Sequence, residues 1–170
     1  MLTGCIMSVT TLLTGVVHGG GPTLALNNPP TMDPYVQTFP ISANASDFSP
    51  FLISPANETT AWIVAVKIRT NAPPLSRILS YTVPHGITQI SKPFVGVPAS
   101  IRYNESSGQT RVWLLENNSL DYYDPVANTL NTSYIFPNGS PQSMAIDKHG
   151  VLWVTLYGSN EIARYDPTSK

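Results

Sequence analysis

Few side chains in this sequence have the chemistry of a catalytic or metal-binding site. Of the three histidines, His18 lies in an apolar N-terminal stretch, while His85 and His149 lie in predicted turns. The single Cys5 excludes an intramolecular disulfide and a zinc site made of cysteines. The sequence contains no glycine-rich phosphate loop, no nucleophile elbow and no His/Cys cluster. We therefore interpret His85 and His149 as turn residues.

Three aspartates lie in or near two Tyr-Asp-Pro sequences. Asp124 and Asp166 each stand between a tyrosine and a proline, and Asp121 precedes the first of these sequences. Aspartate at a turn accepts hydrogen bonds from its own backbone, and proline ends a strand because it cannot donate to a ladder. We therefore predict that all three aspartates serve turns.

The elements that would position any site are clearest in residues 141–170. We expect strands at Pro141–Asp147, Val151–Thr155 and Glu161–Tyr165. Gly150 ends the first turn, because glycine adopts positive φ without strain. Strands of about five residues separated by short turns predict an antiparallel sheet.

The same pattern of proline, tryptophan and tyrosine recurs upstream. Trp62, Trp113 and Trp153 occupy equivalent places in units that begin near Pro50, Pro98 and Pro141, and they are 51 and 40 residues apart. A period of about 40–50 residues with several strands in each unit is typical of β-propeller blades. We expect an all-β partial β-propeller of about three four-stranded antiparallel blades, in which the tryptophans are blade-packing residues.

A leading strand precedes each unit. We expect these strands at Tyr35–Ile41, Ile87–Val95 and Leu130–Phe136, which places the repeats near 35–82, 87–128 and 129–170. Residues 23–34 form a linker rich in proline and asparagine. Three blades are too few to close a ring of typically four to eight. Missing blades or a second copy would be needed to complete it, and we favour missing blades.

The last unit, P-x-x-M-A-x-D-x-x-G-x-L-W-V-T followed by N-x-I-A-R-Y-D-P, resembles the blade repeat of the streptogramin (virginiamycin B) lyases and of NHL-type propellers. The match is closest at 141–170, weaker at 98–129 and loosest at 50–81. The resemblance implies a propeller fold. In the lyases it also implies a histidine proton donor after the first proline of a repeat and a glutamate after its tryptophan motif. That glutamate helps to hold Mg²⁺ while a lactone ring opens by elimination.

No repeat of this sequence carries both of those residues. The third has Gln142 and Leu156 at the two positions, and the second has Ala99 and Glu116. The first has Phe51 at the histidine position, and no glutamate follows its tryptophan. Glu116 is the one weak catalytic candidate. We expect no cofactor, except Mg²⁺ if the chain is part of a lyase-like enzyme.

Composition points away from nucleic acid and towards export. The net charge is −1 and only 11% of residues are charged, so no basic surface is expected. Residues 1–22 are apolar and lack lysine and arginine, which indicates a signal sequence or an anchor without the usual positive start. Leu2-Thr3-Gly4-Cys5 also matches a lipobox, although it lies too close to the start for its own apolar region. The alternative is that residues 1–22 form an unstructured or strand-like tail.

The sequence contains six glycosylation sequons, which is more than random placement of its residues would give. They support an extracellular or cell-surface location. They begin at Asn44, Asn57, Asn104, Asn117, Asn131 and Asn138. Asparagine, serine and threonine also cluster in turns, which is the simpler explanation.

Two hypotheses remain open. The first is an exported propeller segment that binds a protein or a glycan and has no catalytic pair of its own. The second is a fragment of a lyase-like enzyme with its catalytic blades beyond residue 170.

Overall fold

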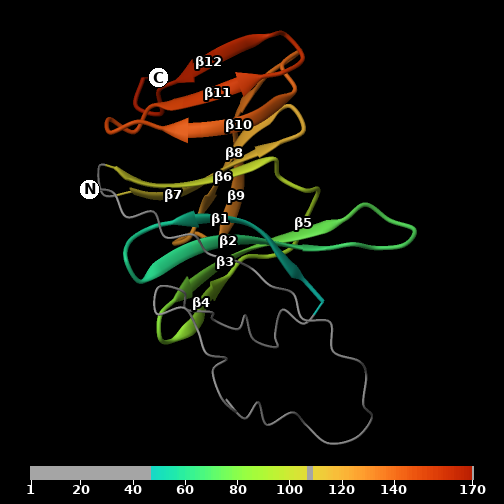
Figure 1. Ribbon diagram of the computed structural model, residues 1–170, viewed down its shortest axis with the longest axis vertical. Helices are drawn as coiled ribbons and strands as arrows, with labels where there is room; N and C mark the ends of the chain where they lie inside the picture. Colours follow the sequence, from blue (N-terminus) through green and yellow to red (C-terminus); the bar gives the residue numbers. More distant parts are fainter. Residues whose placement is uncertain (1–46, 107–108, 170) are drawn as a thin grey trace, which may run out of the picture. The chain divides into compact units, whose positions relative to one another are not determined.

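The computed structural model describes residues 47–106 and 109–169, and all regular structure in these ranges is β-strand. The strands form three antiparallel sheets in chain order (Figure 1). The first sheet contains β1 (Ser49–Pro55), β2 (Thr60–Lys67), β3 (Leu75–Thr82), β4 (Gly86–Ile90) and β5 (Phe94–Val95). The second contains β6 (Ser100–Ser106), β7 (Gln109–Glu116), β8 (Ser119–Asp124) and β9 (Thr129–Ile135), and the third contains β10 (Pro141–Ile146), β11 (Leu152–Leu156) and β12 (Glu161–Tyr165).

The sheets follow one another as propeller blades do. Their first strands, β1, β6 and β10, lie next to one another in turn, and apolar side chains fill the space between successive sheets. The prediction of an all-β, partial β-propeller of about three blades is confirmed. The third sheet has three strands rather than four within the described ranges. No helix in those ranges is long and apolar enough to cross a membrane.

The sheets and the repeat units of the sequence are offset by one strand. β9 pairs with β8, so the strand expected to lead the third unit completes the second sheet. The strand expected at Ile87–Val95 is divided into β4 and β5, and both pair with β3 of the first sheet. Each leading strand in the described ranges therefore closes the preceding sheet, because a short turn returns the chain to its neighbour. The strand expected at Tyr35–Ile41, the linker at 23–34 and the N-terminal segment 1–22 lie outside the described residues.

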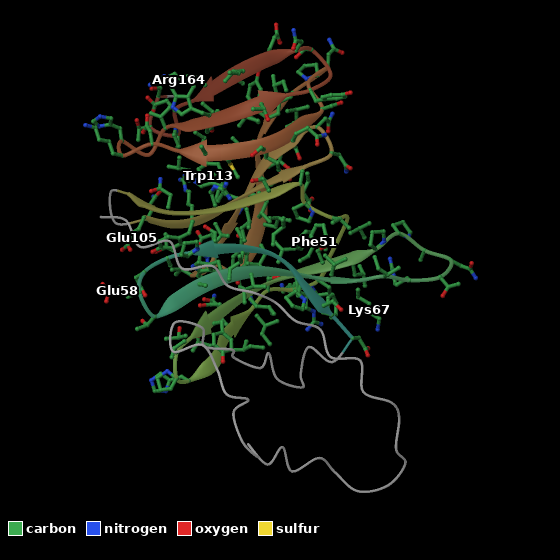
Figure 2. All side chains as sticks on the ribbon, viewed as in Figure 1. Phe51, Glu58, Lys67, Glu105, Trp113 and Arg164 are labelled. Atoms are coloured by element: carbon green, nitrogen blue, oxygen red, sulfur yellow. The ribbon has the colours of Figure 1, made fainter. Side chains whose placement is uncertain are left out.

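Strand alternation directs Trp62 and Trp113 towards the next sheet in the chain. Trp62 belongs to a core shared with Ile101, Leu114 and Tyr123 of the second sheet. Trp113 belongs to a core shared with Met144 and Val154 of the third sheet, and Figure 2 shows it between the two sheets. The residue after each tryptophan points to the opposite face, because side chains alternate along a strand.

Trp153 has the same place in the third sheet but a different environment. Leu152 and Val154 face the second sheet, so Trp153 faces away from it and is 44% exposed. Its indole Nε1 donates a hydrogen bond of 3.4 Å to Asp147 Oδ2. No further sheet in the described part of the chain covers Trp153, and its role in blade packing stays a prediction.

Candidate functional site

Two carboxyl groups come together on the hairpin formed by β7 and β8. Glu116 ends β7, Ser119 begins β8, and the two residues are paired across the hairpin. Asp121 pairs with Leu114, so it lies on the same face as Glu116, one diagonal step away. Asn117 makes the tight turn possible by adopting a positive φ of 44°. This hairpin face points into the core between the first and second sheets, as Leu114 does.

The two carboxyl groups are only partly satisfied by hydrogen bonds. The Ser119 hydroxyl lies 2.8 Å from Asp121 Oδ2 and 3.1 Å from the Glu116 carbonyl oxygen, and can donate to either. Glu116 Oε1 and Asp121 Oδ1 are buried and have no hydrogen-bond partner among the described residues. Asp121 is only 4% exposed. Neither carboxyl forms an ion pair with any lysine, arginine or histidine that the structure describes.

This environment changes the protonation of Glu116. Burial, and then the charge of Asp121, raise the pKa of the Glu116 carboxyl from 4.5 to about 7. A carboxylate is expensive in an apolar setting, and a second negative charge nearby raises that cost. Near neutral pH, Glu116 can therefore hold a proton or release one. Such a group suits general acid or base chemistry if a substrate reaches it.

The linker between the first two sheets passes beside this carboxyl. Gly96 adopts φ of 122°, and a Cβ at this residue would lie 3.6 Å from Glu116 Oε1. The Ser76 hydroxyl donates to the Gly96 carbonyl oxygen at 2.6 Å, which fixes the linker to β3. Ala99, at the position of the expected acid, is exposed, and its backbone nitrogen donates to Leu115 O at 2.7 Å. The linker brings no proton-donating side chain at Ala99.

The equivalent places in the other sheets carry no carboxyl group. Leu156 is buried in the core between the second and third sheets, while Gln142 is exposed. Phe51 is exposed on β1 (Figure 2). In the described residues, no group of three or more His, Cys, Asp or Glu side chains could hold a metal ion. Glu116 and Asp121 have the oxygen atoms that Mg²⁺ takes as ligands, but they form only a pair.

The prediction that Asp121 serves a turn is wrong. Asp121 lies within β8, buried, with its carboxylate beside Ser119 rather than bonded to its own backbone. Asp124 and Asp166 behave as predicted. Asp124 accepts hydrogen bonds from Val126 N and Ala127 N, and Asp166 accepts them from Thr168. The sequence Glu-Asn-Asn-Ser-Leu-Asp could have predicted the carboxyl pair. If Asn-Asn forms a two-residue hairpin turn, the glutamate and the aspartate lie on the same face of the hairpin.

The other candidate residues are dispersed. His85 lies exposed in the turn between β3 and β4, and His149 lies exposed in the turn before β11. The sequon asparagines Asn57, Asn117 and Asn138 are exposed outside strands. Asn104 and Asn131 are half-buried on β6 and β9, whereas Asn44, His18 and Cys5 lie outside the described residues.

The same aromatic contact joins both pairs of neighbouring sheets. Trp62 packs edge-on against Tyr123, with ring centroids 6.0 Å apart and planes at 66°. Trp113 packs in the same way against Tyr165, at 5.9 Å and 66°. Each tryptophan thus meets the tyrosine that precedes the aspartate of the next repeat. Sequence spacing found these residues but not the contact between them.

Comparison with known proteins finds similar structures. No protein-family model matches the chain. No curated protein matches it. A streptogramin B lyase structure is 19% identical, with a TM-score of 0.45, over 76% of this chain and 44% of that one. A catalytically inactive virginiamycin B lyase from Staphylococcus aureus, in complex with quinupristin, is 14% identical, with a TM-score of 0.37, over 72% and 57% of the two chains.

The match therefore spans about half the length of those two structures. Both are lyases of the kind that the repeat sequence resembles.

Proposed function

We propose that this chain is an exported β-propeller segment that acts as a binding scaffold and has no catalytic pair of its own. The observation that carries the proposal is the exposed outer face of the third sheet. Trp153 stands there, at the position where Trp62 and Trp113 of the other two sheets are covered by a neighbour.

The composition of this face suggests what it binds. Its exposed residues, by strand register, are Ser143, Ala145, Trp153, Thr155, Ile162 and Arg164. Trp153 and Ile162 offer apolar area, and small side chains beside them leave room for a ring. The two internal interfaces are built from the same kind of face, so the partner in our proposal is another antiparallel sheet with an aromatic residue in the place of Tyr165. A large aromatic side chain gains much of its binding energy when such a face is covered.

Self-association tests this proposal directly. We expect the purified chain to form concentration-dependent assemblies in sedimentation velocity, because copies can cover the exposed face. Trp153→Lys should shift the distribution towards the monomer. Tyr157→Lys is the matched control, since Tyr157 is more exposed than Trp153 but follows β11 rather than lying within it. A monomer at every concentration, or equal effects of the two changes, would contradict the proposal.

Export is the second part of the proposal, and it rests on the sequons. The side chains of Asn57, Asn117 and Asn138 are exposed, so an oligosaccharide could be attached without disturbing a sheet. Expression in a secreting eukaryotic cell should give a ladder of masses that an amide-cleaving glycosidase collapses. Unmodified protein retained in the cell would remove this support. The near-neutral charge favours a protein partner over nucleic acid.

A second function is favoured by one observation: Glu116 Oε1 is buried beside Asp121 without a hydrogen-bond partner among the described residues, and this setting raises the pKa of Glu116. In this alternative the chain is part of a larger lyase-like enzyme, and Glu116 is a remnant of its repeated carboxylate position. Strongly shifted pKa values cluster at functional sites, although structural carboxyl pairs show them too. Ala99 beside Glu116 supports the scaffold over the enzyme, because it offers no acid.

A further inference from the structure

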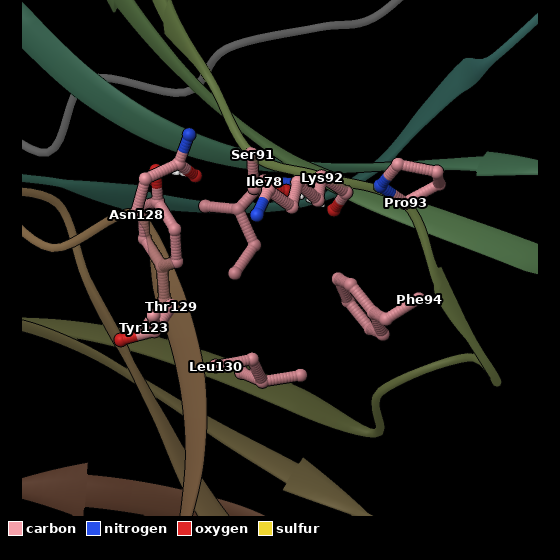
Figure 3. A pocket seen from close by; sticks show the side chains of 9 residues that line it. All are labelled: Ile78, Ser91, Lys92, Pro93, Phe94, Tyr123, Asn128, Thr129 and Leu130. Atoms are coloured by element: carbon pink, nitrogen blue, oxygen red, sulfur yellow. Dashed lines mark hydrogen bonds between the residues drawn. The ribbon is translucent and has the colours of Figure 1, made fainter.

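A cavity of about 230 Å³ opens between the outer strands of the first and second sheets (Figure 3). It is separate from the carboxyl pair, since neither Glu116 nor Asp121 lines it. Its volume corresponds to roughly eight waters at about 30 Å³ each, and an apolar cavity of about 150 Å³ is known to take up benzene. The space therefore suits one six-membered ring with a small substituent.

The floor and walls of the cavity are apolar. Ile78 and the ring of Tyr123 are fully buried beneath it, and the half-buried Phe94 and Leu130 form the sides. In Figure 3 the Phe94 ring and Leu130 lie on the open space below Ile78. The polar atom of the floor is already satisfied, because the Tyr123 hydroxyl accepts from Gln89 Nε2 at 3.3 Å and donates to Asn128 Oδ1 at 3.1 Å. An apolar group can enter without stranding a buried hydrogen-bonding group.

The rim of the cavity carries unused hydrogen-bond donors. Lys92 is exposed and forms no ion pair with the residues that the structure describes. Asn128 uses its side-chain oxygen for Tyr123, and its amide nitrogen donates to no group in the described ranges. No aspartate or glutamate is among the residues that line the cavity. The nearby Asp124 directs Oδ1 at Val126 N and Ala127 N of its own turn.

We propose that this cavity binds a small organic carboxylate with an aromatic or branched apolar body. The apolar body would lie between Phe94 and Leu130, over the ring of Tyr123. The carboxylate would lie at the rim, where Lys92 and the Asn128 amide can donate to it. Binding sites of this kind combine apolar walls with a few polar groups that fix orientation. The lysine gives the site its preference for an anion, because a hydrogen bond from a charged donor is stronger than one between neutral groups.

The test compares three probes on the folded chain by two-dimensional amide NMR. Benzoate carries both the ring and the charge, benzyl alcohol carries only the ring, and acetate carries only the charge. We expect benzoate to shift the amides of Ser91, Phe94 and Leu130 and to saturate with a Kd on the order of 1 mM, as suits a small ligand in a half-open site. Benzyl alcohol should bind several-fold more weakly, and acetate should cause no saturable shift.

Three variants distinguish binding in the cavity from nonspecific binding to the protein surface. Lys92→Met keeps the apolar stem and should weaken benzoate by roughly fivefold while leaving benzyl alcohol unchanged. Lys148→Met, in an exposed turn of the third sheet, should change neither. Leu130→Phe should reduce binding of both ring compounds by filling the cavity, with circular dichroism used to confirm folding.

Several results would overturn the proposal. Saturable shifts that map outside the cavity, acetate binding as well as benzoate, or an unchanged benzoate affinity in Lys92→Met would each do so. The absence of a benzoate shift at 50 times the expected Kd, about 50 mM on the scale given above, would also do so.

Discussion

The two interfaces between neighbouring sheets share one aromatic contact, and at one equivalent position they carry side chains of different chemistry. Both contain a tryptophan set edge-on to a tyrosine of the next sheet, at 6.0 and 5.9 Å. Three residues after the second tryptophan comes Glu116, which faces back towards the first sheet. Three residues after the third comes Leu156, which faces back towards the second sheet and is buried in an apolar core. A glutamate and a leucine thus occupy equivalent positions in two repeats with the same strand arrangement.

This comparison separates what holds the sheets together from what could give them chemistry. In each interface the tryptophan lies on the forward face of one sheet, whereas the tyrosine and the variable position both lie on the backward face of the next sheet. They come from different strands, the tyrosine from β8 or β12 and the variable position from the end of β7 or β11. A repeat can therefore exchange leucine for glutamate without losing the aromatic contact, at the cost of a partly buried carboxyl group in one interface.

The largest expected effect concerns the tryptophans themselves. Trp113→Ala should lower the free energy of unfolding by about 3–5 kcal/mol, because it leaves a cavity in a fully buried core. Trp153→Ala should lower it by less than about 1 kcal/mol, since the side chain is already half exposed. Urea unfolding followed by circular dichroism measures both. Equal losses would show that Trp153 is covered in solution, which self-association could explain and which dilution would reveal.

How much of this could be predicted depends on which physical rule applied. The strand Glu161–Tyr165 was predicted with its observed bounds, because alternation and Asp166-Pro167 mark it within one short segment. The pairing of β9 with β8 could not be predicted from a repeat, since a period does not say where a unit starts. The position of Asp121 was missed because its closeness to Tyr-Asp-Pro outweighed its register across the hairpin. Contacts between sheets, such as Trp113 with Tyr165, depend on how the sheets pack, and strand spacing carries no information on that.

The carboxyl pair should make the first interface sensitive to pH in a way that the second is not. The pKa of Glu116 is about 7 in the folded chain against 4.5 ordinarily, so the folded state binds more protons between these values. The contribution of Glu116 to the free energy of unfolding should therefore be greatest below about pH 4.5 and should be lost as pH rises through 7. After allowance for solvent screening of a partly exposed group, the loss should be about 1–2 kcal/mol.

Urea unfolding at half-unit steps from pH 5 to 8 measures this loss. Glu116→Gln should flatten the profile, because the amide does not titrate. Glu161→Gln, at an exposed position at the start of β12, is the control and should keep the slope. A profile that rises with pH, or a slope that survives in Glu116→Gln, would place the titrating group elsewhere. The range avoids lower pH, where Asp166, whose pKa is lowered to about 2 by hydrogen bonds from Thr168, would add an opposite trend.

The smallest expected effect is catalytic, and it addresses the alternative function. Elimination from a lactone needs a proton donor and a carboxylate that converge on one substrate within hydrogen-bond distance. The first interface has Glu116 opposite Ala99, whose methyl group has no acidic proton. The second has the buried Leu156 with Gln142. The chain alone should therefore open a streptogramin B lactone in the presence of Mg²⁺ no faster than buffer does, as followed by mass and ultraviolet absorbance. A chain heated until unfolded is the control for trace contamination. Turnover by the folded chain that disappears in Glu116→Gln would show that another residue supplies the acid. It would also make the first interface an active site rather than a variant of the second.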